Sequence, residues 1–201
     1  MKAEYINPFI SAAMNVFQMM VGITPEKGQL SARKGIFTSQ QCNIVLGVTG
    51  QLEGQIIIGM SIFTADKIAS KMLGTTIRTF DELAASAIAE LGNMISGAAL
   101  TELASTGIQC NLSPPSLIRG TNVRISTLEI PTLVVPLQTV HFRHRDVHKH
   151  QVGFVLLVEF DRFASVGGFR DHLQPVLRQD VFERHAHKKR VVRNHDAFRH
   201  C

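Results

Sequence analysis

One long segment, residues 79–105 (TFDELAASAIAELGNMISGAALTELAS), constrains the fold of this 201-residue chain more than any other. At about 100° per residue, its larger apolar side chains fall on one side of a helix: Leu83, Ala87, Ile88, Leu91, Met94, Ile95, Ala98 and Ala99. Thr79 and Glu82 have the spacing of a capping box at its start. Gly107 suits a left-handed residue at its end. The segment therefore predicts one amphipathic helix with a buried stripe.

The opposite side of this helix carries polar and small residues: Glu82, Ser86, Glu90, Asn93, Ser96 and Gly97. Glu90 and Asn93 are neighbours there, because residues three apart have Cβ atoms about 5–6 Å apart. Asn is unfavourable inside helices, so Asn93 needs an explanation. The nearby small residues, Ser86, Ala89, Gly92 and Gly97, would let another backbone approach. Taken alone, the pair also fits an ordinary solvated helix surface.

The wider sequence resembles a known family. The pattern Ser86-x-x-x-Glu90-x-x-Asn93, followed by Pro114 and Pro115, resembles the signature of the CheC/CheX/FliY phosphatases. The resemblance covers about residues 1–140 and includes residues 5–28, 45–60 and 130–139. One such helix is found where the CheC and FliY types carry two, which favours a CheX-like member. Pro115 follows Asn93 after twenty-one residues, one fewer than the family usually has.

The resemblance implies a phosphatase that hydrolyses the aspartyl-phosphate of a CheY-like response regulator. Asn93 would position the attacking water, because an amide can hold water but cannot act as a base. Glu90 would dock on the regulator's lysine, with Ser86, Gly97 and Pro115 in supporting roles. The regulator would bring Mg²⁺, so no cofactor of the chain's own is expected, and a homodimer is a family implication. The alternative is a non-catalytic module that binds a response regulator or the flagellar switch.

The predicted fold is α+β, a CheC-like α/β sandwich in which a mainly antiparallel sheet packs with helices. The pattern predicts a helix over residues 8–21 that Asn7 and Pro8 start and Gly22 ends. It predicts a second helix over residues 64–73 that Thr64 caps and Gly74 stops.

Strands are expected where short apolar or alternating runs meet turn residues. Residues 29–34 could form a first strand. A hairpin is predicted from residues 36–49 and 55–60. Residues 122–128 and 132–139 are predicted to form a second antiparallel pair. Between the long helix and this pair, Pro114 and Pro115 predict a stiff turn.

Composition favours a soluble, cytoplasmic protein, because no apolar run approaches the length of a membrane helix and the N-terminus lacks a signal core.

Cys42 and Cys110 are interpreted as reduced, buried small hydrophobes, and Cys201 gives an odd total. Residues 1–140 carry equal numbers of acidic and basic side chains. The whole net charge of +5 therefore comes from residues 141–201. No membrane or nucleic-acid partner is expected for the balanced part.

All nine histidines follow residue 140, where the amino-acid composition changes abruptly. Four interpretations of this C-terminal part remain open. His141, His144, His148 and His150 could bind a transition metal. The segment could be a basic arm for nucleic acid. Residues 152–160 could supply a final edge strand. The reading frame of the gene could also shift near residue 140. The sequence after that point would then have no selected function. The predicted domain spans residues 1–160, and residues 161–201 form a basic tail, disordered or frame-shifted.

Overall fold

The computed structural model describes residues 3–126, 132–138 and 153–163. Within them lie the helices α1 (Ala3–Val21), α2 (Ile62–Leu73) and α3 (Glu82–Ser105). The strands, in chain order, are β1 (Glu26–Lys27), β2 (Ser31–Arg33), β3 (Ile36–Thr38), β4 (Cys42–Gly50), β5 (Leu52–Met60), β6 (Cys110–Leu112), β7 (Ser116–Arg119), β8 (Arg124–Ser126), β9 (Thr132–Gln138) and β10 (Gly153–Phe163).

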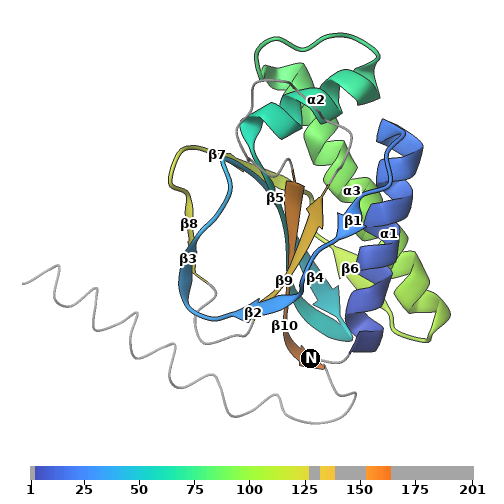
Figure 1. The fold of residues 1–201 in the computed structure, drawn as a ribbon. Helices are drawn as coiled ribbons and strands as arrows, with labels where there is room; N and C mark the ends of the chain where they lie inside the picture. Colours follow the sequence, from blue (N-terminus) through green and yellow to red (C-terminus); the bar gives the residue numbers. More distant parts are fainter. Residues whose placement is uncertain (1–2, 127–131, 139–152, 164–201) are drawn as a thin grey trace, which may run out of the picture. The chain divides into compact units, whose positions relative to one another are not determined.

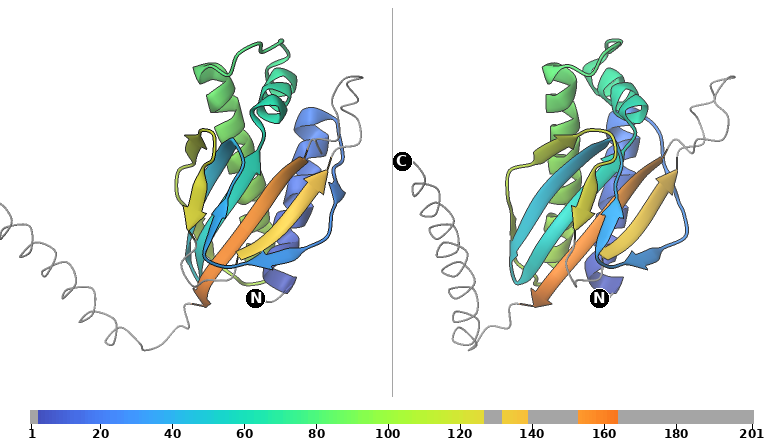
Figure 2. Two further views of the ribbon diagram at one scale, coloured as in Figure 1. Left: turned by 60° about the vertical axis from the view of Figure 1, so that its left-hand side comes forward. Right: turned by 90° about the vertical axis from the view of Figure 1, so that its left-hand side faces the viewer.

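The main sheet is antiparallel at every pairing, in the order β1-β9-β10-β5-β4-β6. β2 also pairs with β9, β7 pairs with β4, and β3 and β8 form a separate ribbon. Figures 1 and 2 show α1 and α3 side by side along one face of the sheet, with β3 and β8 beyond the other face. The predicted α+β sandwich is confirmed.

The core lies between the helices and the sheet, and strand alternation decides which side chains enter it. Four fully buried residues are paired in register across neighbouring strands: Ile44 of β4, Ile58 of β5, Leu156 of β10 and Val135 of β9. The opposite face of the sheet carries a smaller cluster, to which β8 contributes: Ile57, Val134, Val45 and Ile125. The sheet is thus apolar on both faces, although the larger core is on the helix side.

Helix α3 packs on β4 through a glycine. A Cβ added to Gly92 would lie 2.7 Å from Cγ2 of Ile44, so the helix approaches the strand as closely as a glycine allows.

By length and composition alone α3 could cross a membrane. However, 44% of its most apolar window is buried inside the protein, and core helices pass the same test.

The structure corrects the predicted start of α3. Asp81, not Thr79, is the N-cap, and its side chain accepts a hydrogen bond from the Ala84 N–H at 2.8 Å. The predicted end is confirmed: Gly107 has a φ of +90°. The N–H groups of Gly107 and Ile108 donate to the carbonyls of Ala104 and Leu103, which is a Schellman motif.

The predicted faces of α3 are partly wrong. Leu83, predicted inside, is 55% exposed, and Ala98 is exposed as well. Ser96, predicted outside, is fully buried. The cause is the close contact at Gly92, because a helix that presents its glycine to the sheet also turns Ser96 inward. The apolar periodicity predicted the helix correctly, but the small residues changed which side of it is buried.

α3 begins later than predicted, whereas the other two helices begin earlier. α1 begins at Ala3 and contains Pro8 in its interior, so Asn7 is not its cap. α2 is capped by Ser61, whose hydroxyl accepts from the Thr64 N–H, so Thr64 is one turn inside the helix. Both predicted stops are confirmed, since Gly22 and Gly74 have φ values of 73° and 65°. Glycine marks these ends reliably because it adopts positive φ without steric cost.

Among the strands, the predicted hairpin is confirmed for β4 and β5, with Gly50 (φ 119°) at its turn, but the start of its predicted first arm is the separate strand β3. The predicted pairing of residues 122–128 with 132–139 is wrong. β8 pairs with β3 instead, and β9 pairs with β1, β2 and β10. A strand inside a sheet takes its partners from distant segments, so adjacency in sequence misled the prediction.

β10 corrects one interpretation of the histidine-rich part. Residues 152–160 were considered as an edge strand, but β10 lies inside the sheet between β9 and β5 and continues to Phe163. The four clustered histidines, and the part of the basic tail that follows Phe163, lie outside the described residues. The metal, nucleic-acid and reading-frame interpretations therefore stay predictions, as does the domain boundary at residue 160.

Candidate functional site

The outward face of α3 collects four of the five predicted site residues. Ser86 and Glu90 are exposed, and Asn93 and Gly97 are half-buried. The steps from 86 to 90, 90 to 93 and 93 to 97 are each one helical turn, so the four residues follow one another along one side. Serine and glycine flank the pair, so Glu90 and Asn93 are the long polar side chains of this surface.

Glu90 and Asn93 contact each other. The Asn93 Nδ2 group donates a hydrogen bond to Glu90 Oε2 at 3.5 Å, which is the long end of the range for such bonds. A long bond at an exposed position holds the two groups together only weakly. The side-chain carbonyl of Asn93 and the other carboxylate oxygen of Glu90 remain available as hydrogen-bond acceptors for water or a partner.

The two glycines near the pair have different roles. Gly92 was predicted to leave room for another backbone, but that room is filled by Ile44. Gly97 has nothing within 4 Å of the position where a Cβ would lie, so it leaves the surface open beside Asn93. Of the two glycines, only Gly97 can serve the predicted close approach.

Pro115, the fifth predicted residue, lies on a different element, in the link between β6 and β7. Both strands pair with β4, and Ser113 fixes the link. The Ser113 N–H donates to the Gly47 carbonyl at 2.9 Å, and its hydroxyl accepts from the Gly47 N–H at 2.8 Å. The proline link is therefore held to the sheet, as predicted for a stiff turn, although its relation to Glu90 and Asn93 rests on the resemblance.

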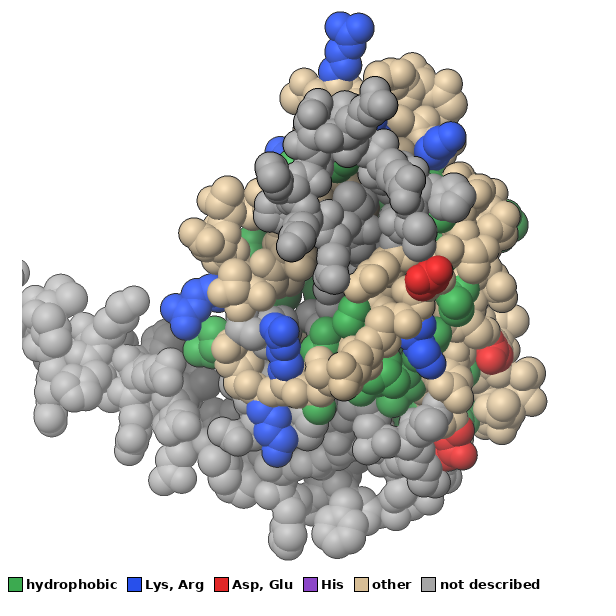
Figure 3. Space-filling model, in the orientation of Figure 1, with side chains coloured by type: hydrophobic (Ala, Val, Ile, Leu, Met, Phe, Trp, Pro, Cys, Tyr) green, Lys and Arg blue, Asp and Glu red, His purple; other side chains and the backbone are tan. Residues whose placement is uncertain are grey.

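Charge is sparse on the outward face of α3, where Glu82 and Glu90 are acidic and Glu90 is the one beside the amide. Glu102 is further along the helix and accepts a hydrogen bond from Ser11 of α1 at 2.9 Å. On the face of the molecule in Figure 3, Lys and Arg side chains lie at the left, at the top and on the right, whereas the Asp and Glu side chains in view lie on the right.

Within residues 3–126, 132–138 and 153–163, no group of three or more His, Cys, Asp or Glu side chains could hold a metal ion. Cys42 and Cys110 are free thiols. Cys42 is fully buried, as predicted, but Cys110 is only half-buried. Burial raises the pKa of Cys42 from 9.0 to about 11, so its thiol is an inert core group and not a nucleophile.

Comparison with known proteins decides the family. Residues 42–138 match the family model described as "Chemotaxis phosphatase CheX". The CheY-P phosphatase CheX of Thermotoga maritima is 32% identical over 149 residues, which cover 74% of this chain and 96% of that protein. The chain belongs to the CheX family. The prediction of a CheX-like phosphatase, made from the helix signature, is confirmed.

Solved structures agree with this assignment. A putative chemotaxis protein from Desulfovibrio vulgaris Hildenborough is 30% identical, with a TM-score of 0.66 over 79% of this chain and 97% of that chain. The CheX–CheY–BeF₃–Mg²⁺ complex of Borrelia burgdorferi has 28% identity and a TM-score of 0.64, and it covers 79% of this chain and 98% of that chain. A CheX of this fold therefore forms a complex with a CheY.

Proposed function

We propose that this CheX-family chain hydrolyses the aspartyl-phosphate of a CheY-like response regulator through the outward face of α3. Asn93 positions the attacking water, and Glu90 pairs with a lysine of the regulator. The observation that carries the proposal is the exposed Glu90–Asn93 contact, with Nδ2 and Oε2 3.5 Å apart, on a helix face of small neighbours. The T. maritima relative supports the substrate, since it is described as acting on CheY-P.

The chemistry fits what these side chains can supply. Phosphoryl transfer needs an in-line nucleophile and charge stabilisation, and little covalent work by the protein. The Asn93 amide can accept from and donate to one water, which orders it for attack without taking a proton. The regulator would carry the Mg²⁺ and the phosphoryl group, so the chain itself requires no cofactor for this role.

Glu90 has the complementary task of docking. An exposed ion pair contributes about 0–1 kcal/mol, but a pair desolvated inside a complex contributes considerably more. Gly97 and Ser86 keep the surface low, so that α3 can lie across the regulator's phosphorylation site. Pro115 would hold the neighbouring link rigid. The reaction takes place in the cytoplasm, and a homodimer is compatible with it.

The test measures loss of regulator phosphate with CheY, Mg²⁺ and a phosphodonor. Asn93→Ala should reduce the accelerated rate by about a hundredfold, the scale of a lost positioning group, while the complex with CheY–BeF₃–Mg²⁺ persists. Asn15→Ala, at an exposed position of α1, is the matched control. If Asn93→Ala were as active as the wild type, the assigned water-positioning role would be wrong.

Glu90→Gln separates docking from chemistry. This variant should weaken the complex by about tenfold or more, because the lysine loses its charged partner. Glu102→Gln, on the same helix, should leave binding unchanged. A wild-type chain that binds phosphorylated CheY without accelerating loss of phosphate would instead identify a non-catalytic binding module.

A further inference from the structure

A shallow cavity of about 520 Å³, widely open to solvent, lies between α2, the α2–α3 connection and the end of β7, and neither Glu90 nor Asn93 lines it. Its walls come from separate parts of the chain. Asp66 belongs to α2, Phe80 precedes α3, and Arg119 ends β7. Its volume falls within the roughly 300–1,000 Å³ range of small-molecule sites.

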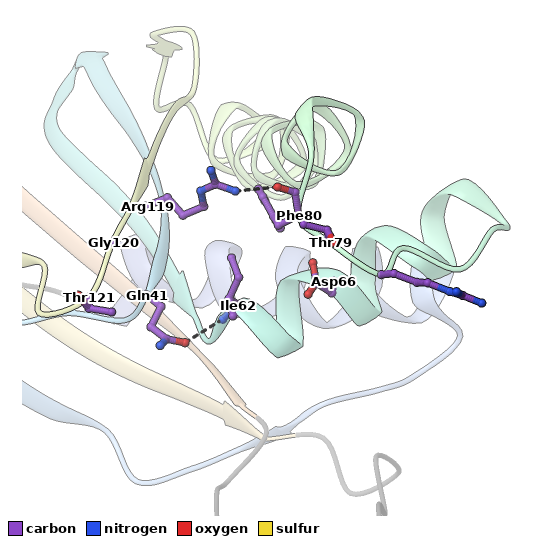
Figure 4. Close-up of a pocket in the computed structure, with 9 residues that line it drawn as sticks. Gln41, Ile62, Asp66, Thr79, Phe80, Arg119, Gly120 and Thr121 are labelled. Carbon is purple, nitrogen blue, oxygen red and sulfur yellow. Dashed lines mark hydrogen bonds between the residues drawn. The ribbon is translucent and has the colours of Figure 1, made fainter.

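Arg119 is held in place on one side of this cavity. Its Nη1 group donates to the Phe80 carbonyl at 2.8 Å, and its guanidinium lies over the Phe80 ring, 5.0 Å from the centroid. Figure 4 shows the arginine fixed in this way at the cavity. One of its five N–H donors is used in that bond, so a fixed cation with further donors faces a potential ligand.

Asp66 lies on the opposite side, across Phe80 from Arg119 (Figure 4). Its Oδ1 atom is buried and has no hydrogen-bond partner in the part of the chain that the structure describes. Burial, the largest contribution, raises the pKa of this carboxyl group. A carboxyl group with one oxygen buried and without a donor is costly, so a ligand in the cavity that donates to the other oxygen would stabilise Asp66.

Asp66 and Arg119 thus line one cavity, as does Arg78, and no ion pair joins Asp66 to Arg119 among the described residues. A ligand that satisfies both must carry an acceptor for the guanidinium and a donor for the carboxyl group. Carboxylates match the planar guanidinium well. Chloride and sulfate lack the donor and would be repelled by an ionised Asp66. Ile62 and Phe80 add apolar surface for a short carbon skeleton.

We propose that this cavity binds a small amino or hydroxy carboxylic acid, with its carboxylate on Arg119 and its ammonium or hydroxyl group directed to Asp66. The site is separate from the Glu90–Asn93 pair, so it stands or falls independently of the proposed phosphatase mechanism. Gln41 and Thr121, which also line the cavity, supply further polar groups.

Isothermal titration calorimetry of the full chain with L-aspartate, L-malate and succinate tests the proposal. These acids share one carbon skeleton and differ at C2, where they carry an ammonium group, a hydroxyl group or hydrogen. Aspartate and malate should bind saturably, about tenfold more tightly than succinate, because only they donate to Asp66. Absence of saturable binding by all three up to about 10 mM, well above a millimolar Kd, overturns the proposal.

Two variants locate the binding. Asp66→Asn keeps the shape of the side chain and should reduce the preference for aspartate over succinate. Arg119→Gln should weaken all three acids by about tenfold or more. Arg124→Gln, an exposed arginine of β8, should change nothing. Because Arg119 also bonds Phe80, Asp66→Asn is the test that leaves this contact intact. Wild-type affinities and preferences in both cavity variants would contradict the assigned site.

Discussion

Gly92 of α3 lies so close to Ile44 of β4 that an added Cβ would be 2.7 Å from Ile44 Cγ2. Ile44 is fully buried and its Cγ2 atom is attached directly to a branched Cβ, so it cannot move aside freely. This contact sets how far α3 stands from the sheet. It therefore sets the height at which Glu90 and Asn93 are presented.

Gly92→Ala should consequently destabilise the protein. The overlap with Ile44 should lower the free energy of unfolding by about 1–3 kcal/mol, the usual cost of overpacking a core. Alanine's better helix propensity, worth about 1 kcal/mol, offsets part of this cost. Urea unfolding followed by circular dichroism measures the difference. A variant more stable than the wild type would show that α3 does not pack on β4 in this way.

Gly97→Ala is the matched comparison on the same helix. No atom lies within 4 Å of its added Cβ, so only helix propensity changes, and stability should rise by up to about 1 kcal/mol. Opposite signs for the two alanine variants would support the assignment of one glycine to packing and the other to the surface. A loss of stability in Gly97→Ala would contradict it.

A large side chain at position 97 tests the surface itself. Gly97→Phe should fold, because Gly97 lies on the outward face and no atom lies within 4 Å of its added Cβ. It should lower phosphatase activity by about tenfold or more, if α3 must lie close to the regulator, since a displacement near 1 Å can cost a hundredfold. Asn15→Phe on α1 controls for added apolar surface. Full activity in Gly97→Phe would place the docking surface elsewhere.

Asp81 and Thr79 give a test of the corrected helix start. Asp81→Ala removes the acceptor of the Ala84 N–H and should cost about 1 kcal/mol of stability, the typical loss at an N-cap. Thr79→Ala should have little effect, because Thr79 is exposed and lies before the cap. Equal losses measured by thermal unfolding would show that both residues contribute to the cap.

Cys42 makes stability depend on alkaline pH. Its pKa is raised from 9.0 to about 11, chiefly by burial, so above pH 9 the unfolded chain releases a proton that the folded chain retains. The contribution is fully present below pH 9 and is lost as the pH rises toward 11, with a slope of at most about 1.4 kcal/mol per pH unit. Unfolding of Cys42→Ala and wild type should show a stability difference that shrinks over this window. A constant difference would contradict the buried-thiol assignment.

Local features were predictable because their causes are local. The end of α3 at Gly107 and the ends at Gly22 and Gly74 follow from positive φ angles that glycine adopts freely. The contact of Glu90 with Asn93 follows from helical spacing alone. The starts were predicted less well. Thr79 and Asp81 both have side chains that can cap, and the neighbouring structure selected Asp81.

The pairing of strands was less accessible. β8 and β9 follow one another closely in the sequence, yet β8 pairs with β3 while β10 lies beside β9. Leu156 of β10 completes the buried row of Ile44, Ile58 and Val135, although it comes from the part of the chain with an unusual composition. Such pairing depends on contacts between distant segments, which single-sequence patterns do not encode.

By itself, the sequence determined a long helix with Glu90 and Asn93 one turn apart, a set of glycine stops and an α+β class. These depend on helix period and backbone stereochemistry, which act over a few residues. The tertiary structure decided that Gly92 and Ser96 face the sheet, that Gly97 faces outward, and that Asp66 and Arg119 meet at one cavity. Those outcomes depend on which surfaces pack together, and packing is settled only when segments far apart in the chain come into contact.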